Sequence, residues 1–174
     1  MDLREKKTKN SIKNAFIELR TKKQLERITV KELCELAMIS KATFYLHYND
    51  IYDLSDCLQR EVIQSVLENI TSPELILTDS IAFTKELFNA FVPHENLIEI
   101  LFSDTQASVL PTSLEEAIRD KIFLLAPHLK DNPKLDIILS YKIQGGYYAY
   151  LLHRKKYDFD YIVDVVGNMA SFEL

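Results

Sequence analysis

The apolar positions of this chain recur every three or four residues, which is the spacing of amphipathic helices. Ile12, Ala15, Phe16 and Leu19 form such a row near the N-terminus. No stretch alternates between apolar and polar residues well enough to predict a strand. We therefore expect an all-α fold, built from an N-terminal three-helix unit followed by a helical bundle. The predicted helices cover residues 4–21, 30–37, 41–48, 51–70, 79–92, 95–103, 113–126, 134–154 and 158–172.

Residues that begin and interrupt helices support these boundaries. Thr29, followed three positions later by Glu32, has the pattern of a capping box. Ser40 and Asp50 are candidate N-caps of the next two helices. Prolines are expected in the gaps farther along the chain, because proline interrupts the helical hydrogen-bond ladder. These prolines are Pro73, Pro93, Pro111, Pro127 and Pro133.

The composition fits a helical protein without membrane spans or a disulfide framework. Of 174 residues, 3 are Gly and 5 are Pro, too few turn-forming residues for a β-sandwich or a disordered chain. No apolar run approaches the roughly 18 residues of a membrane span, and the charged N-terminus lacks the apolar segment of a secretory signal. The two cysteines, Cys34 and Cys57, predict no disulfide framework. We expect a cytoplasmic protein.

The net charge of −5 hides an uneven distribution. Residues 1–50 contain 11 Lys and Arg against 7 Asp and Glu, a net charge of +4, whereas residues 51–174 contain 10 against 19, a net charge of −9. A basic segment on an acidic body is typical of a DNA-binding unit joined to a body with another role, because phosphate contacts need only a local cationic face. A solvated lysine-rich helix is the alternative interpretation.

Two short predicted helices, 30–37 and 41–48, are separated by three residues. This is the spacing of a helix-turn-helix, in which the first helix packs across the second and the second enters the major groove of DNA. The pattern places apolar side chains inward and short polar or basic ones outward. The inward set is Leu33, Ala37, Ile39 and Phe44, and the outward set is Lys41 and Thr43. A helical hairpin that binds no DNA is the alternative.

The segment from Ile28 to Leu54 closely resembles the DNA-binding signature of TetR/AcrR-type transcriptional regulators. The strongest part of the match runs from Thr43 to Tyr48 and is followed by an acidic residue and Leu54. The remaining two-thirds of the chain agree with that family in architecture alone. The resemblance implies a DNA-binding domain over residues 1–50, a connecting helix over 51–70, and a regulatory and dimerisation domain over 71–174.

The resemblance also makes residues 41–48 the recognition helix and a double-stranded DNA operator the partner. Lys41 can reach guanine acceptors or a phosphate, and the methyl group of Thr43 can contact a thymine methyl. The family commonly has Gly where Met38 stands, and a left-handed backbone there would cost Met about 1 kcal/mol. The DNA-binding residues that the resemblance implies are Thr29, Ser40, Lys41, Ala42, Thr43, Tyr45, His47 and Tyr48.

Two further sites are hypotheses about the C-terminal domain. Its aromatic side chains could line a pocket for a small-molecule effector, or they could simply fill a helical core. The candidate pocket residues are Phe83, Phe88, Phe91, Phe102, Phe123, Tyr141, Tyr147 and Tyr148. The last two predicted helices are the candidate dimer interface, with Leu139, Gly146, Tyr150, Ile162, Val165, Val166 and Met169. The glycine pair at 145 and 146 either lets another helix approach closely or marks a kink.

Together, these features and the resemblance predict a homodimeric TetR-like repressor that binds a palindromic operator and is released by an effector bound in its C-terminal domain. One alternative is the same fold acting without a ligand or under a protein partner, as a regulator or coactivator. Another is a helical adaptor whose N-terminal helices bind protein. We expect no enzyme, because no phosphate-binding glycine loop or nucleophile motif occurs. We expect no metal site or cofactor, because the four histidines are scattered.

Overall fold

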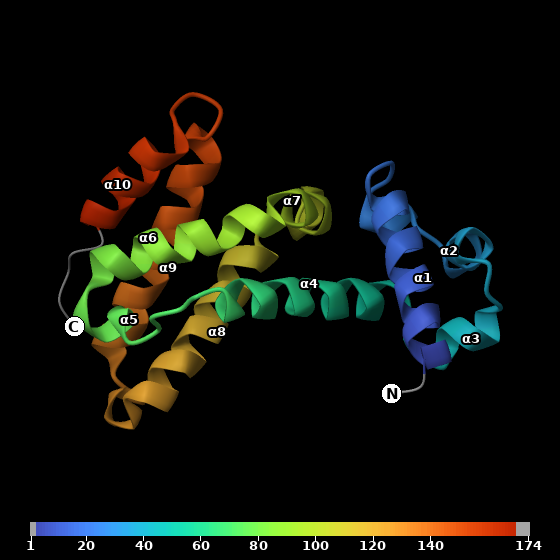
Figure 1. The fold of residues 1–174 in the computed structure, drawn as a ribbon, viewed down its shortest axis with the longest axis horizontal. Helices are drawn as coiled ribbons and strands as arrows, with labels where there is room; N and C mark the ends of the chain where they lie inside the picture. Colours follow the sequence, from blue (N-terminus) through green and yellow to red (C-terminus); the bar gives the residue numbers. More distant parts are fainter. Residues whose placement is uncertain (1–2, 170–174) are drawn as a thin grey trace. The chain divides into compact units, whose positions relative to one another are not determined.

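The computed structural model describes residues 3–169, and every regular element in that range is a helix (Figure 1). The predicted all-α class is confirmed. The α-helices are α1 (Leu3–Arg20), α2 (Val30–Ala37), α3 (Lys41–Tyr45), α4 (Ile51–Glu68), α5 (Leu75–Thr78), α6 (Ser80–Phe91), α7 (Glu95–Leu101), α8 (Val109–Leu125), α9 (Pro133–His153) and α10 (Phe159–Met169). Short 3₁₀ turns lie at η1 (Leu25–Arg27), η2 (Val92–His94), η3 (Asp104–Gln106) and η4 (Pro127–Leu129). None of the helices in this range combines the length and apolar character needed to cross a bilayer.

The predicted caps are present at the starts of α2, α3 and α4. The side chains of Thr29, Ser40 and Asp50 each accept the backbone N–H of the residue three positions later, at 3.2, 3.0 and 2.8 Å. Each cap therefore satisfies one of the N–H groups that a helix start leaves without an intrahelical partner. The Glu32 carboxylate pairs with Lys23 Nζ at 2.5 Å instead of closing the predicted capping box.

Several predicted boundaries are wrong. The predicted helix 41–48 ends at Tyr45, and α8 begins at Val109 rather than at residue 113. Pro111 consequently lies in the first turn of α8 instead of in a gap. Proline is tolerated there because the N–H groups of a first turn have no partner within the helix. The short helix α5 was not predicted, and the end of the predicted helix 158–172 beyond Met169 lies outside the described residues.

The contacts divide the chain into two compact units, and each unit is built from two separate segments. Unit 1 comprises Met1–Val62 and Glu95–Ala107, and unit 2 comprises Ile63–His94 and Ser108–Leu174. The segment Glu95–Ala107 thus packs with the N-terminal residues, although the sequence analysis assigns it to the C-terminal domain. The functional roles assigned to the two predicted domains stay predictions.

Unit 1 has a core formed where α1 packs against α2 and α7, and where α2 packs against α3. The segment Glu95–Ala107 contacts this core through polar side chains as well as apolar ones. Gln59 on α4 is almost fully buried and donates from Nε2 to the Leu101 carbonyl at 3.0 Å. The fully buried apolar residues of this unit include Ile12, Phe16, Leu33, Phe44, Leu54 and Leu101.

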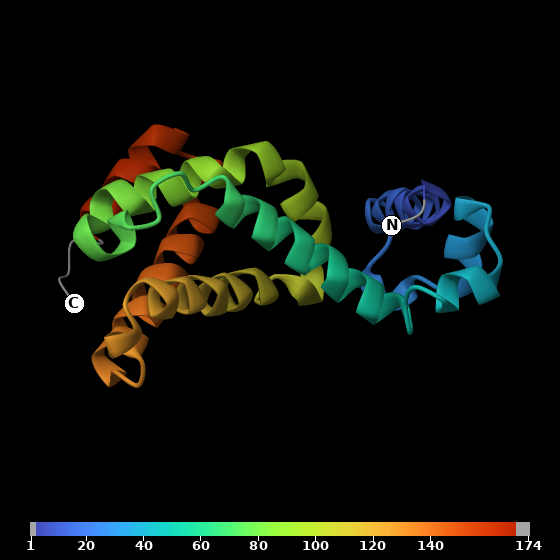
Figure 2. The ribbon, with the colours of Figure 1, turned by 60° about the horizontal axis from the view of Figure 1, so that its bottom comes forward.

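In unit 2, α10 packs against both α6 and α9, and α9 packs against α8. Figure 2 shows α8 and α9 joined at one end through the turn that contains η4. A carboxylate links these two helices, since Glu115 on α8 accepts the Ser140 hydroxyl of α9 at 2.6 Å and the Arg119 guanidinium at 2.8 Å. The buried apolar core of the unit includes Phe83, Leu87, Ile118, Ile122, Leu135, Leu139 and Ile162.

Candidate nucleic-acid interface

The turn between α2 and α3 is sharp because Met38 adopts a left-handed backbone, with φ 54° and ψ 45°. The Ile39 N–H then donates back to the Cys34 carbonyl at 3.0 Å, and the Met38 N–H donates to the Glu35 carbonyl at 3.3 Å. This is the hydrogen-bond pattern that ends many helices at a glycine. Here the side chain of Met38 is almost fully exposed, so its unusual backbone is fixed by the turn rather than by packing of the side chain.

One face of helix α3, the face that carries Phe44, is buried in unit 1. The Phe44 ring is fully buried and makes edge contacts with the Tyr45 ring, with centroids 5.4 Å apart. At the start of the helix, Ser40 Oγ lies 2.8 Å from Thr43 Oγ1, so the two hydroxyl groups bond to each other, and Ser40 Oγ also accepts the Thr43 backbone N–H. The short helix is therefore anchored at its centre and at its beginning, and its other side chains are left toward solvent.

The predicted DNA-binding residues fall into three groups by exposure. Thr29, Ser40, Lys41, Ala42 and Tyr45 are exposed. Thr43 and His47 are partly buried, and Tyr48 is buried against Phe44, with ring centroids 5.8 Å apart. Burial also raises the pKa of the Tyr48 hydroxyl above its ordinary value. The structure thus presents most of the set on the surface of α2 and α3, while Tyr48 belongs to the core of unit 1.

Several of the positively charged side chains in unit 1 form ion pairs with carboxylates of the same chain. Lys9, Lys13, Lys22, Lys23 and Lys31 each lie within 4 Å of a carboxylate. Among the described residues, the exposed cations of this unit without such a pair include Lys6, Lys7, Arg27, Lys41 and Arg60, whose guanidinium bonds to Cys57 Sγ instead. Lys6, Lys7 and Arg27 are not among the predicted site residues, although the run of lysines at the start of α1 is a visible signal in the sequence.

The start of α1 lies near the end of α3. The hydrogen bond from Lys9 is the main reason that the pKa of Glu5 is lowered, and the nearby charge of His47 contributes to the same shift. The free lysines at positions 6 and 7 therefore belong to the same end of unit 1 as the C-terminal end of α3. Anions that approach α3 also meet these cations.

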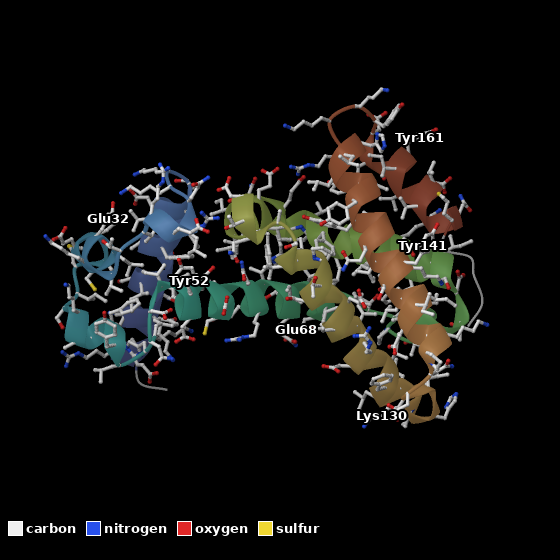
Figure 3. All side chains as sticks on the ribbon, turned by 180° about the vertical axis from the view of Figure 1, so that it is seen from behind. Glu32, Tyr52, Glu68, Lys130, Tyr141 and Tyr161 are labelled. Carbon is white, nitrogen blue, oxygen red and sulfur yellow. The ribbon has the colours of Figure 1, made fainter. Side chains whose placement is uncertain are left out.

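None of the aromatic residues predicted to line a pocket is among those that line the hollow at Asn69 and Glu86, and they differ in exposure. Phe83 is buried in the core of unit 2, and Phe102 is buried in unit 1. Tyr141 and Tyr148 are exposed on α9, where Figure 3 labels Tyr141. Phe88 instead packs edge-on against Tyr150 and Phe159. The remaining members, Phe91, Phe123 and Tyr147, are partly buried.

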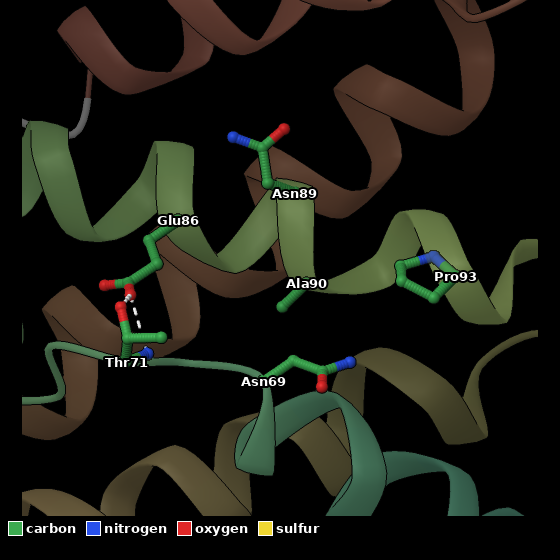
Figure 4. Close-up of a pocket in the computed structure, with 6 residues that line it drawn as sticks. All are labelled: Asn69, Thr71, Glu86, Asn89, Ala90 and Pro93. Atoms are coloured by element: carbon green, nitrogen blue, oxygen red, sulfur yellow. Dashed lines mark hydrogen bonds between the residues drawn. The ribbon is translucent and has the colours of Figure 1, made fainter.

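A hollow of about 480 Å³, open to solvent and called the cavity below, lies at the surface of unit 2 (Figure 4). Its six lining residues are Asn69, Thr71, Glu86, Asn89, Ala90 and Pro93. Sequence analysis missed all of them, because polar residues near helix ends usually face solvent and give no periodic signal. Glu86 was the one recognisable exception, since it falls between the inward positions Phe83, Leu87 and Ala90 on α6.

The predicted dimer-interface residues are divided between the inside and the outside of unit 2. Leu139 and Ile162 are buried within the chain, whereas Val165 and Met169 are exposed. A Cβ atom on Gly146 would lie 3.3 Å from Cγ1 of Val166, so Gly146 gives close approach to α10 of its own chain. Tyr150 and Val166 are partly buried. Whether any of these residues contacts a second copy stays a prediction.

Other chemistry finds little support in the described residues. Cys34 and Cys57 are free thiols, and Cys57 is partly exposed rather than buried as an inert core residue would be. Between residues 3 and 169, no group of three or more His, Cys, Asp or Glu side chains is placed to hold a metal ion. Comparison of the chain with protein-family models, curated proteins and solved structures gives no match.

Proposed function

We propose that this protein is a TetR-like DNA-binding transcriptional regulator, a homodimeric repressor that binds a palindromic operator and is released by an effector in its C-terminal unit. The observation that supports DNA binding is the arrangement of α2, the Met38 turn and α3. Phe44 anchors α3 from inside, which leaves Lys41, Ala42 and Tyr45 exposed together. An exposed helix of this kind, following a tight turn, fits the major groove.

The charges of the same region support this proposal. Lys41 at the start of α3 has no carboxylate partner among the described residues and can donate to guanine or phosphate. The exposed Tyr45 hydroxyl can donate to a phosphate. Lys6 and Lys7 add positive charge at the end of unit 1 where α3 ends. These contacts would orient the helix and supply a salt-dependent part of the affinity.

The test is DNA binding by variants of two exposed residues. Duplexes selected from random oligonucleotides would be titrated with the wild-type chain, with Lys41→Ala and with Tyr45→Phe. We expect both variants to bind several-fold more weakly, and Lys41→Ala to reduce the slope of log affinity against log salt by about one. Lys130→Ala, an exposed lysine of unit 2, is the matched control and should bind as the wild type does. Failure of the wild-type chain to select any duplex would overturn the proposal.

A second copy of the chain is part of the proposal, because one recognition helix reads too few base pairs to select a site in a genome. Helix α9 carries a row of exposed apolar side chains at positions 137, 141, 148 and 152, and α10 carries another at 161, 165 and 169. Figure 3 labels one tyrosine of each row, Tyr141 and Tyr161. Each row recurs at helical spacing, so each lies along one side of its helix. We name these seven residues the α9–α10 face.

A protein-binding adaptor is a second candidate, and a specific observation favours it. Met38 and Leu46, on either side of α3, are 91% and 81% exposed. Large apolar side chains this exposed are typical of surfaces that bind proteins when they form a patch. The same oligonucleotide selection separates the two candidates, since an adaptor would select no DNA. Leu46→Ser should weaken binding of a protein partner and leave the operator affinity of a DNA-binding regulator within about threefold.

A further inference from the structure

The cavity of unit 2 lies between the end of α4 and helix α6. Asn69 and Thr71 follow α4 on one side, and Glu86, Asn89 and Ala90 belong to α6 on the other (Figure 4). Its volume of about 480 Å³ is within the usual range for sites that bind small molecules. Four of its six lining residues have polar side chains, so the cavity suits a ligand that forms hydrogen bonds.

Among the described residues that line the cavity, Glu86 is the only charged one. Its Oε1 atom accepts three hydrogen bonds, from the Thr71 hydroxyl at 2.5 Å, the Thr71 N–H at 2.7 Å and the Ser72 N–H at 3.0 Å. The bond from the Thr71 hydroxyl is the largest cause of a lowered pKa, so the carboxyl group is ionised at neutral pH. The carboxylate is therefore fixed in position and negatively charged.

Among the described residues, no cation forms an ion pair with Glu86. No nearby cation contributes to the lowering of its pKa. The adjacent Lys85 points to another partner, since its Nζ lies 2.7 Å from Asp164 Oδ1. The second carboxylate oxygen, Oε2, is hidden from solvent and has no hydrogen-bond partner among the described residues. A buried acceptor without a donor is unfavourable, and more so when it is charged.

The amide groups around the cavity complete its chemistry. Asn69 Nδ2 lies 3.1 Å from His94 Nε2, which holds that amide at the cavity edge. Asn89 is exposed and its side chain makes no hydrogen bond with any described residue, so its side-chain amide can both donate and accept. A complementary ligand would place a positive group near Glu86 and hydrogen-bonding groups near the two amides.

We infer that this cavity binds a small organic cation, such as an amine or a guanidine, and that this ligand is the effector of the proposed regulator. The inference rests on the proposed function for its regulatory part. The ammonium or guanidinium group would supply the positive charge that Glu86 lacks, and the rest of the molecule would contact the end of α4 through Asn69 and Thr71.

Binding is tested by calorimetric titration with putrescine, agmatine and choline, which differ in the shape of their cationic group. The uncharged 1,4-butanediol, with the same chain length as putrescine, is the control ligand. We expect at least one of the cations to bind and the diol not to bind. If none of the three cations binds, or if the diol binds as tightly as putrescine, the inference is overturned.

Two variants assign that binding to the cavity. Glu86→Gln keeps an oxygen for the Thr71 and Ser72 donors but removes the charge, and we expect it to weaken cation binding at least tenfold. Asn89→Leu changes an exposed helical position, so it should fold normally while its larger apolar side chain obstructs the cavity. Glu116→Gln, an exposed carboxylate of α8, is the matched control and should bind as the wild type does. Equal affinity in all three variants would place the binding elsewhere and overturn the inference.

A separate measurement tests whether the bound cation is the effector. Because coupling between two ligands is reciprocal, a cation that releases the protein from its operator must bind more weakly when the operator is present, by the same factor. Cation binding that is unaffected by saturating operator would overturn the assignment as effector. If the chain selects an operator but binds no cation, the inference fails and DNA binding stands. If it selects no DNA, the proposed function and the effector role fail, and the titrations alone decide cation binding.

Discussion

Arg20 on α1 donates from Nη2 to the hydroxyl of Ser103 at 2.7 Å, across 83 residues of sequence. The same Nη2 also donates to the Ile100 carbonyl at 3.1 Å, and Nη1 donates to the Lys23 carbonyl at 2.9 Å. Arg20 is almost fully buried, since 5% of the residue is exposed. A buried cation is stabilised by hydrogen bonds to its N–H groups. Nε has no partner among the described residues, but the two bonds from Nη2 join the segment Glu95–Ala107 to α1.

Replacing Arg20 should therefore destabilise unit 1. Arg20→Met keeps most of the apolar length of the side chain but removes the donors to the Ile100 carbonyl and the Ser103 hydroxyl. We expect the free energy of unfolding in urea to fall by about 2–3 kcal/mol, the usual worth of hydrogen bonds to a charged group. Lys22→Met, which removes an exposed pair with Glu18, is the control and should change it by less than about 1 kcal/mol. Equal losses in the two variants would contradict the role given to Arg20.

The turn at Met38 offers a stabilising substitution. A non-glycine residue in the left-handed region is strained by about 1 kcal/mol, and the exposed Met38 side chain gains little from packing in return. We expect Met38→Gly to raise the free energy of unfolding by about 0.5–1 kcal/mol, measured by urea denaturation. Leu36→Gly, two residues earlier within α2, should instead lower it by about 1 kcal/mol, because glycine is unfavourable inside a helix. A destabilised Met38→Gly variant would mean that the side chain makes a contribution that its exposure hides.

Local signals in the sequence predicted the helices well, but they could not predict which segments far apart in the sequence contact each other. Thr29, Ser40 and Asp50 act as caps within four residues of their partners, so their role is visible in a short window. The bond between Arg20 and Ser103 depends on two segments that meet through the fold. For the same reason, Tyr48 was assigned to the surface from its position in a motif, while the folded chain buries it against Phe44.

The candidate cavity shows the same limit. Aromatic residues were the compositional signal for a pocket, yet Tyr141 and Tyr148 lie on the outside of α9, and the cavity is lined by polar side chains. An aromatic side chain fills a core, a surface row or a pocket equally well by composition. Its location depends on which helix faces are covered, and that is decided by packing between helices far apart in sequence.

Acid should weaken the contact between α8 and α9 through Glu115. Burial alone would raise the pKa of this carboxyl. Hydrogen bonds from Ser140, Gln144 and Arg119 together lower the pKa by more than burial raises it, so the net shift is downward from 4.5. A lowered pKa in the folded state stabilises the protein above pH 4.5, and that stabilisation is lost as the pH falls through the folded value. We expect the free energy of unfolding to fall less steeply below pH 4.5 in Glu115→Gln than in the wild type.

The neighbouring carboxylate is the control for this experiment. Glu116 is exposed on the same helix, and Glu116→Gln should leave the acid dependence of the free energy of unfolding close to that of the wild type. Denaturant titrations at several pH values between 3 and 6 would provide the comparison. The same acid dependence in the wild type and Glu115→Gln would show that the bonds to Ser140 and Arg119 do not stabilise the ionised carboxyl.

The adjacent glycines of α9 should respond in opposite directions to substitution. A Cβ on Gly145 meets no atom within 4 Å, so Gly145→Ala should raise the free energy of unfolding by about 0.5–1 kcal/mol through helix propensity. At Gly146 the Cβ would lie 3.3 Å from Val166, and Gly146→Leu should lower it by about 1–3 kcal/mol through overpacking against α10. Thermal and urea denaturation measure both. A stabilised Gly146→Leu variant would mean that α10 moves away from α9 without loss.

The final prediction concerns the α9–α10 face proposed for dimerisation. In a two-fold dimer the same surface meets its own copy, so one charged substitution places two like charges in the interface. Leu152 on this face is 74% exposed in the single chain, so Leu152→Glu should fold normally as a monomer. We expect sedimentation to show a mass near that of one 20.2 kDa chain for this variant, where the wild type sediments as a pair.

Leu124 gives this experiment a matched control, because it is also a leucine that is 74% exposed, but it lies on α8, outside the proposed face. Leu124→Glu should keep the sedimentation behaviour of the wild type. If the dimer is needed to read two half-sites, Leu152→Glu should also bind the operator at least tenfold more weakly, while Leu124→Glu binds it normally. A Leu152→Glu variant that remains a dimer would exclude this face, and a dimer lost in Leu124→Glu instead would move the interface to the end of α8.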